Sequence, residues 1–207
     1  MTVGIAGAGR MGRALAGALE AAGVPVLLAG VREAVPFEEL WWRASVVLLT
    51  LPFPVALDLM RGVAGRCGGG RTMVDVTNPR LAAAQPVGAA GPAGLAGRSG
   101  GELIAEAART WEVAKAFNTV PAGALGGARV DGCPVSLPIA GTPAAKFDVC
   151  RLARRLGFDP VDAGDISASR ELESLAVLLM RVSDANRLHG RIAIHIGQPA
   201  GFAAAVT

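Results

Sequence analysis

The 207-residue chain contains no tyrosine. This absence excludes the reductases that protonate their substrate with a Tyr-x-x-x-Lys pair. Charged residues make up only 18% of the chain and hydrophobic residues 52%, which excludes a disordered protein. No uninterrupted apolar run approaches the roughly 18 residues of a membrane helix, because the best candidate, residues 46–57, contains two prolines. We therefore expect a globular cytoplasmic protein that does not enter a membrane.

Residues that bind metals or nucleic acids are also few or scattered. Cys67, Cys133 and Cys150 lie far apart, and His189 and His195 are six residues apart, a spacing that suits neither one helix face nor a usual ligand pair. We expect no metal site and no disulfide. The net charge of +3 comes from basic residues spread along the chain without a cluster, so a nucleic-acid partner is not predicted.

Short apolar segments alternate with helical patterns along the chain. This alternation predicts an α/β fold, a doubly wound Rossmann-type parallel sheet with a small helical C-terminal extension. We place the nucleotide-binding domain at residues 1–162 and the extension that packs on it at 163–207. The expected strands are residues 2–6, 24–29, 45–51, 72–76, 113–117, 135–140 and 160–162. The first expected helix follows the first strand's turn and stops at Gly23, and the others are residues 36–42, 56–63, 102–110, 142–156 and 167–182.

One long stretch does not fit this alternation. Residues 81–100 are almost all alanine, glycine and proline, which is typical of a loop. A loop of about 20 residues exceeds the usual connection length, so it is either a disordered excursion or a lid over a site.

A glycine motif follows the first expected strand and opens the first expected helix. Its pattern is G-x-G-x-x-G, and in this context it predicts dinucleotide binding. Gly7 would permit the tight turn, Gly9 would let the backbone approach the pyrophosphate, and Gly12 would allow close packing of helix on sheet. The cofactor-binding residues expected here are Gly7, Ala8, Gly9, Arg10, Met11 and Gly12.

The end of the second expected strand indicates which dinucleotide binds. An NAD site would place Asp or Glu near positions 29–31, but the sequence there is Ala-Gly-Val, followed by Arg32. The guanidinium of Arg32 could bind the 2′-phosphate of NADP, and Arg10 could add a second positive charge. We therefore expect NADP(H) rather than NAD.

Several further segments together resemble one family. The most specific are Lys-Ala-Phe-Asn-Thr at 115–119 and Asp-Ala-Gly…Ser-x-Ser-Arg…Glu-Ser-Leu at 162–175; Leu-Thr-Leu-Pro at 49–52, Asp-Val-Thr-Asn-Pro at 75–79 and Ser-Gly-Gly-Glu at 99–102 accompany them. In this order they resemble the NADP oxidoreductases that depend on the 8-hydroxy-5-deazaflavin coenzyme F(420), and the related reductase domains of metalloreductases.

The resemblance implies a homodimeric oxidoreductase that transfers a hydride between NADP(H) and the deazaflavin coenzyme F(420). It implies catalysis by positioning rather than by acid–base chemistry, because hydride transfer between two rings needs the reacting carbons held together and water excluded. The residues it assigns to the floor under both rings are Asn118, Thr119, Val120 and Pro121. To the cofactor-binding residues it adds Thr50, Leu51, Pro52, Asn78, Pro79 and Asn118.

Three departures from the family pattern keep other functions open. The family's Ser-Arg-Arg after the second strand is Gly30-Val31-Arg32 here, residues 33–44 hardly leave room for an additional strand, and the tail from residue 186 has no counterpart. One alternative is an NADPH-dependent reductase of an imine, carbonyl or ferric chelate. A C=N or C=O acceptor would need a proton donor, for which the candidates are Asp131, Glu173, His189 and His195. The other alternative is a protein that binds NADP without turnover.

Overall fold

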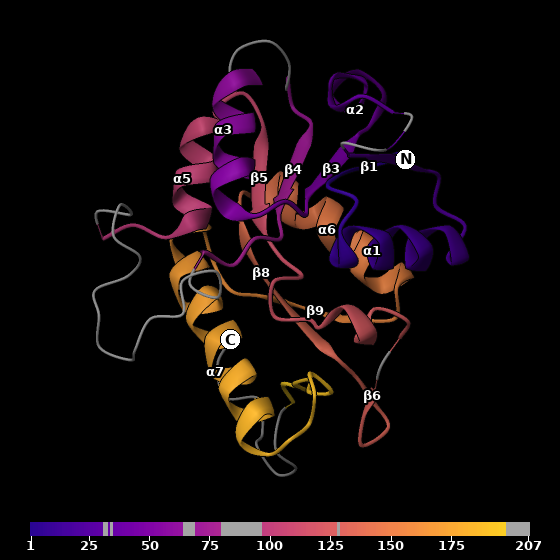
Figure 1. Ribbon diagram of the computed structural model, residues 1–207, viewed down its shortest axis with the longest axis vertical. Coiled ribbons are helices and arrows are strands. Elements are labelled where there is room, and N and C mark those ends of the chain that lie inside the picture. The colour runs from indigo at the N-terminus through magenta and orange to yellow at the C-terminus, as the bar shows by residue number, and fades with distance from the viewer. Residues whose placement is uncertain (31–32, 34, 64–68, 80–96, 128, 198–207) are drawn as a thin grey trace, which may run out of the picture.

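The fold is built on a seven-stranded sheet (Figure 1). It is seen in a computed structural model that describes residues 1–30, 33, 35–63, 69–79, 97–127 and 129–197. The strand order is β2-β1-β3-β4-β5-β8-β9. The strands are β1 (Val3–Ala6), β2 (Val26–Ala29), β3 (Val46–Leu49), β4 (Thr72–Asp75), β5 (Glu112–Lys115), β8 (Ser136–Gly141) and β9 (Asp159–Asp162).

Helices cover both faces of this sheet, as Figure 1 shows. One face packs against α1 (Arg10–Ala21) and α6 (Pro143–Arg155), and the other against α2 (Phe37–Arg43), α3 (Phe53–Val63) and α5 (Gly100–Ala107). Each face has its own apolar core, because the side chains of a strand point alternately to the two faces. The predicted α/β doubly wound class is therefore confirmed.

The sheet is parallel except at one pairing. β8 runs antiparallel to β5, with Lys115 opposite Ala140. The connection between them contains the 3₁₀ turn η1 (Ala122–Ala124) and a small hairpin of β6 (Arg129–Val130) and β7 (Cys133–Pro134). A parallel pairing would need a crossover, usually a helix, and this connection has no α-helix in its described residues, so the chain returns in the opposite direction. The expectation of a parallel sheet thus fails at β5–β8.

The C-terminal part lies beyond the carboxyl ends of the strands. A 3₁₀ turn, η2 (Ile166–Ala168), leads into α7 (Ser169–Ala185), which contacts α5. Figure 1 shows α7 extending away from the sheet. In the described part of the chain, no helix has both the length and the apolar character to cross a membrane.

The long Ala/Gly/Pro stretch lies mostly outside the described residues, so the alternatives of lid and disordered excursion stay open. Its described end begins α5 two residues earlier than the sequence pattern predicts. Ser99 and Glu102 form a capping box there: the Ser99 side chain accepts from the Glu102 amide, and Glu102 accepts from the Ser99 amide at 2.7 Å.

Candidate functional site

The glycine loop has the geometry that its sequence predicts. Gly7 has φ +120°, a conformation that favours glycine. A Cβ on Gly12 would lie 1.8 Å from the carbonyl oxygen of Gly7, so any side chain would force α1 away from the loop. By contrast, a Cβ on Gly9 would meet nothing within 4 Å. The space beside Gly9 is therefore open to a ligand.

Helix α1 has no acidic residue of its own at its N-terminus. Its N-cap is Gly9, no side chain caps it, and its first turn carries no acidic residue. The amides of this turn are thus available to a phosphate, which the dipole at a helix N-terminus also favours. Arg10 is exposed at the first helical position and Met11 is half-buried. This loop fits the pyrophosphate of a dinucleotide.

Thr50 supports the loop from the end of β3. Its hydroxyl donates to the carbonyl oxygen of Gly7 at 2.8 Å and lies 3.1 Å from that of Ala6. Leu51 and Pro52 follow, before α3. Thr50 therefore fixes the glycine turn through its side chain, a role that the sequence pattern alone does not specify.

The segment after β2 contains an acid that the sequence reasoning missed. Glu33 forms an ion pair with Arg13 on α1. Glu33 stands four residues beyond the end of β2, outside the positions at which a ribose-binding acid is usually sought. Arg32 lies outside the described residues, and its assignment to the 2′-phosphate stays a prediction.

A buried ion cluster lies where β4 and β5 end. Lys115 Nζ is 2.7 Å from Asp75 Oδ2 and 3.0 Å from Glu173 Oε1, and no part of these three side chains is exposed. Lys115 also donates to the carbonyl oxygen of Thr77 at 2.7 Å. The amides of Gly100 and Gly101 donate to the Glu173 carboxylate and stabilise its charge further. The cluster joins β4, β5, α5 and α7 at one point.

Two predicted site residues meet beside this cluster. Asn78 Nδ2 donates to the Asn118 carbonyl oxygen at 2.7 Å, and Asn118 Nδ2 donates to Asn78 Oδ1 and to the Leu172 carbonyl oxygen, both at 3.0 Å. Phe117, just before Asn118, has φ +62°, which is strained for a bulky residue. This turn directs the backbone away from β5 and brings Asn118 to Asn78.

Several buried polar atoms at this edge have no hydrogen-bond partner in the described structure. A buried hydroxyl or amide oxygen without a partner is costly, so such atoms are candidates for contact with a ligand or water. Those at this edge are Thr77 Oγ1, Asn118 Oδ1, Thr119 Oγ1 and Ser169 Oγ. They come from the segments after β4 and β5 and from the start of α7.

The other predicted floor and loop residues have apolar surroundings. Val120 is buried in the core that includes Phe117, and Pro121 is the N-cap of η1. Pro79 is buried, and a Cβ on Gly100 would lie 2.7 Å from its Cγ. These residues shape the edge through packing.

The four candidate proton donors are dispersed. Glu173 belongs to the buried ion cluster. Asp131 has φ +49° in the turn of the β6–β7 hairpin, and His195 Nδ1 lies 3.0 Å from the Pro134 carbonyl oxygen beside that hairpin. His189 is exposed after α7. Among the described residues, no side-chain hydrogen bond or ion pair joins Asp131, His189 or His195 to Asn118 or Thr119.

Glu102, in the first turn of α5, has a lowered pKa. The Ser99 amide that donates to its carboxylate lowers the pKa below the ordinary value, and Arg170 contributes in the same direction. Among the described residues, no three His, Cys, Asp or Glu side chains are grouped to hold a metal ion.

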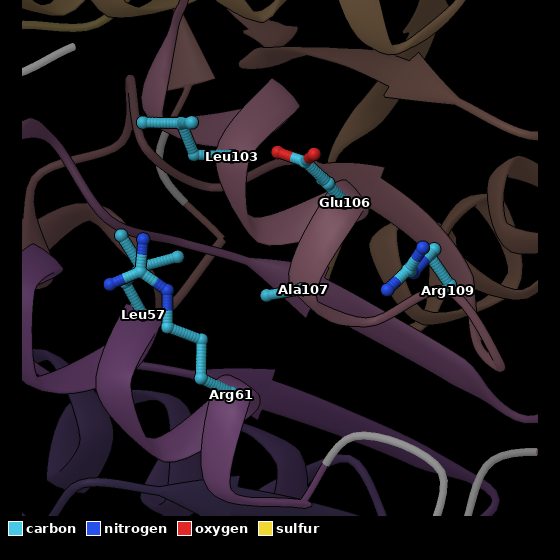
Figure 2. A pocket seen from close by; sticks show the side chains of 6 residues that line it. All are labelled: Leu57, Arg61, Leu103, Glu106, Ala107 and Arg109. Carbon is cyan, nitrogen blue, oxygen red and sulfur yellow. The ribbon is translucent and has the colours of Figure 1, made fainter.

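A hollow of about 300 Å³ lies elsewhere, between α3 and α5. Figure 2 shows Leu57 and Arg61 on one side and Leu103, Glu106, Ala107 and Arg109 on the other. None of the residues predicted to bind cofactor lines it. Glu106 forms an ion pair there with Arg98.

Known proteins share this fold and sequence pattern. A protein from Arthrobacter sp. FB24 named as an F420-dependent NADP-reductase superposes with a TM-score of 0.77 at 23% identity over 90% of this chain and 95% of its own. Metalloreductase STEAP3 of Rattus norvegicus is 29% identical over 193 residues. The match covers 86% of this chain but only 37% of STEAP3. Both classes are those that the sequence motifs resemble, and the resemblance is confirmed.

No family model matches the chain. A hypothetical protein from Sinorhizobium meliloti, SMa0349, has a TM-score of 0.68 and covers 82% of this chain. The two sequences are 30% identical, and the match spans 88% of the S. meliloti chain. The protein therefore belongs to the same family as SMa0349.

Proposed function

We propose that the protein is an NADP-dependent oxidoreductase that transfers a hydride between NADP(H) and the deazaflavin coenzyme F(420). The open glycine loop supports dinucleotide binding, and the similarity to the Arthrobacter reductase and to STEAP3 supports the class of reaction. The choice of deazaflavin rests mainly on one observation, the state of the ionisable groups at the carboxyl edge of the sheet.

The ionisable side chains at the end of β4 and β5 are committed to one another. Lys115, Asp75 and Glu173 are fully buried and paired, so none of them is free to exchange a proton with a substrate. Residues 80–96, which follow β4, contain no Asp, Glu, His or Lys. Reduction of a C=N or C=O bond needs a positioned proton donor, whereas a deazaflavin that accepts a hydride at a ring carbon takes its one proton at a ring nitrogen, which water can supply. The edge therefore suits a ring acceptor.

Each group of site residues has a proposed task. Gly7, Gly9 and the first turn of α1 bind the pyrophosphate, and Thr50 holds the loop in shape. The unpartnered oxygens of Asn118 and Thr119 hold the carboxamide of the nicotinamide, and Pro121 and Val120 keep water from the rings. NADP(H), when bound, supplies or accepts the hydride.

The experiment is to mix purified protein with NADPH and oxidised coenzyme F(420) and to follow both absorbances. We expect stoichiometric consumption of the two, and no turnover by the Gly9→Val variant. Binding of NADPH without reduction of any acceptor would indicate a protein that only binds the nucleotide.

A second candidate is the reduction of a ferric chelate, which the similarity to STEAP3 favours. Reduction of ferric chelates but not of coenzyme F(420) in the same assay would replace the first proposal by this one. A dominant loss of activity on substitution of Asp131 or a histidine would instead indicate an imine or carbonyl acceptor.

We also propose a homodimer that works in the cytoplasm. Leu178 and Val182, one turn apart on α7, are 56% and 39% exposed, an apolar surface of the kind that partner subunits cover. We expect wild-type protein to have the mass of a dimer in light scattering and Leu178→Glu to be monomeric with an unchanged circular dichroism spectrum. A monomeric wild type would contradict the dimer.

A further inference from the structure

The ion pair between Arg13 and Glu33 joins helix α1 to the segment after β2. In the proposed site, a bound dinucleotide would lie between these two segments. Arg13 lies in the first turn of α1, and Glu33 lies after β2. The side chain of Arg13 is 59% exposed and that of Glu33 only 23%. Glu33 is thus partly enclosed, while Arg13 reaches it from the solvent side.

Glu33 lies against the glycine loop. A Cβ on Gly30 would be 2.8 Å from the Cβ of Ala8 and 3.4 Å from the Cγ of Glu33, so these three residues meet at one place. The Glu33 amide donates to the Gly30 carbonyl oxygen at 3.0 Å and fixes the acid there. In dinucleotide folds, the glycine loop and the end of the second strand enclose the adenosine ribose. The ion pair therefore spans the ribose end of the proposed site.

The charges at this point favour an anion. The first turn of α1 has Arg10 and Arg13, no acid and no side-chain cap. Positive side chains at a helix N-terminus are unfavourable, and a nearby anion relieves the repulsion. Glu33 supplies that anion through its ion pair with Arg13. A 2′-phosphate at the same place would supply a stronger one, since Arg binds phosphate in a bidentate manner.

We propose that Arg13 recognises the 2′-phosphate of NADP and that Glu33 competes with the phosphate for it. Binding of NADP then requires Arg13 to exchange Glu33 for the phosphate, which lowers NADP affinity. With NAD the pair stays intact, and the Glu33 carboxylate accepts a hydrogen bond from the 2′-hydroxyl. The balance of these two residues sets the preference between the cofactors. This inference rests on the proposed function, because it assumes that the glycine loop binds a dinucleotide.

The test compares 2′,5′-ADP with 5′-AMP, which differ only in the 2′-phosphate, by calorimetric titration. NADPH and NADH are titrated in parallel. The variants are Arg13→Gln, Glu33→Gln and the double variant. Glu39→Gln is the matched control, because Glu39 forms an ion pair with Arg43 on α2 in which the arginine is as exposed as Arg13, 56% against 59%.

We expect Arg13→Gln to weaken 2′,5′-ADP and NADPH about 10- to 100-fold, the effect of losing a hydrogen bond to a charged group. Glu33→Gln should strengthen both severalfold and weaken NADH. The double variant should bind like Arg13→Gln, because the competitor matters only while Arg13 is present. Glu39→Gln should change nothing.

Different failures have different meanings. Unchanged NADPH affinity in Arg13→Gln would overturn this inference and leave the proposed function intact. Weaker NADPH binding in Glu33→Gln would overturn the competition, because the acid would then be holding Arg13 in its productive place. A wild-type protein that binds neither dinucleotide would overturn the proposed function, and this inference with it.

Discussion

Lys115 and Glu173 are 58 residues apart in the chain, yet Lys115 Nζ and Glu173 Oε1 are 3.0 Å apart with neither side chain exposed. Removing one member of such a buried pair leaves an uncompensated charge. The ion cluster therefore fastens α7 to the sheet, and its integrity determines whether the edge that carries Asn118 keeps its shape.

We expect Lys115→Met to lower the free energy of unfolding by about 3–5 kcal/mol, the usual cost of breaking a buried ion pair. The matched control is Lys146→Met, which breaks the pair with Asp162, a carboxylate that is 67% exposed, and should cost less than about 1 kcal/mol. Urea unfolding of both variants at neutral pH measures the difference. Equal losses in the two variants would mean that the buried cluster contributes no more than a surface pair.

Gly9 and Gly12 should separate ligand binding from folding. A side chain at Gly9 meets open space, so we expect Gly9→Val to unfold at the wild-type urea concentration while it no longer binds NADPH. A side chain at Gly12 meets the Gly7 carbonyl oxygen, so Gly12→Ala should be destabilised by at least about 1–3 kcal/mol, as overpacked sites are. Urea unfolding and NADPH titration of each variant give both quantities. Unchanged NADPH affinity in Gly9→Val would show that the motif serves only as a turn.

The sequence was sufficient to predict the seven strands of the main sheet and the glycine loop, because both depend on local patterns, but not the short β6–β7 hairpin. The run of Val and Leu at 46–49 and the motif at 7–12 show their structure within a few residues. The antiparallel return of β8 was missed, since it depends on the absence of a helix in a connection that sequence patterns describe poorly. The pairing of Lys115 with Glu173 was missed for a different reason: it joins residues that only the fold brings together.

For the candidate site, the structure shows which predicted residues meet, and their roles stay predictions. Asn78 and Asn118 were assigned to it from motifs, and they do contact each other. The strained φ of Phe117 and the unpartnered hydroxyl of Thr119 leave no mark in the sequence, because neither follows from residue type. Glu33 is not predicted from the pattern, because a ribose-binding acid is expected directly after the second strand and Glu33 lies four residues beyond it.

Because of the capping box of α5, the free energy of unfolding should depend on pH in the acid range. The folded protein holds the pKa of Glu102 below its ordinary value of 4.5, so this group stabilises the fold above that pH and the contribution is lost as the pH falls through the lowered pKa. We expect Glu102→Gln to be destabilised by about 1 kcal/mol at neutral pH, a typical value for a cap, and to approach wild type in strong acid. Urea midpoints at neutral and acid pH measure this. A difference that stayed constant with pH would show that the carboxylate charge plays no part.

The hydroxyl of Thr119 distinguishes a ligand contact from a structural one. Thr119 Oγ1 is buried without a partner in the described structure, whereas Thr50 Oγ1 donates to the Gly7 carbonyl oxygen at 2.8 Å. Replacement by valine keeps the shape and removes the hydroxyl. We expect Thr119→Val to keep or gain stability, since an unsatisfied buried group is removed, and Thr50→Val to lose about 1 kcal/mol.

Thr119→Val, which should not reduce stability, should reduce activity strongly. If Thr119 holds the nicotinamide, Thr119→Val should slow hydride transfer by tenfold or more, because small displacements of the reacting atoms reduce positioning catalysis strongly. His189→Ala and His195→Ala should each cost less than about 1.4 kcal/mol in the barrier, which is tenfold in rate. Stopped-flow measurements of the hydride step over about pH 5 to 9 compare the three variants, and the wild-type profile should be shallow. A steep inflection that disappears in one histidine variant, with Thr119→Val unaffected, would identify an acid–base reductase, and the deazaflavin would then no longer be the acceptor that the site favours.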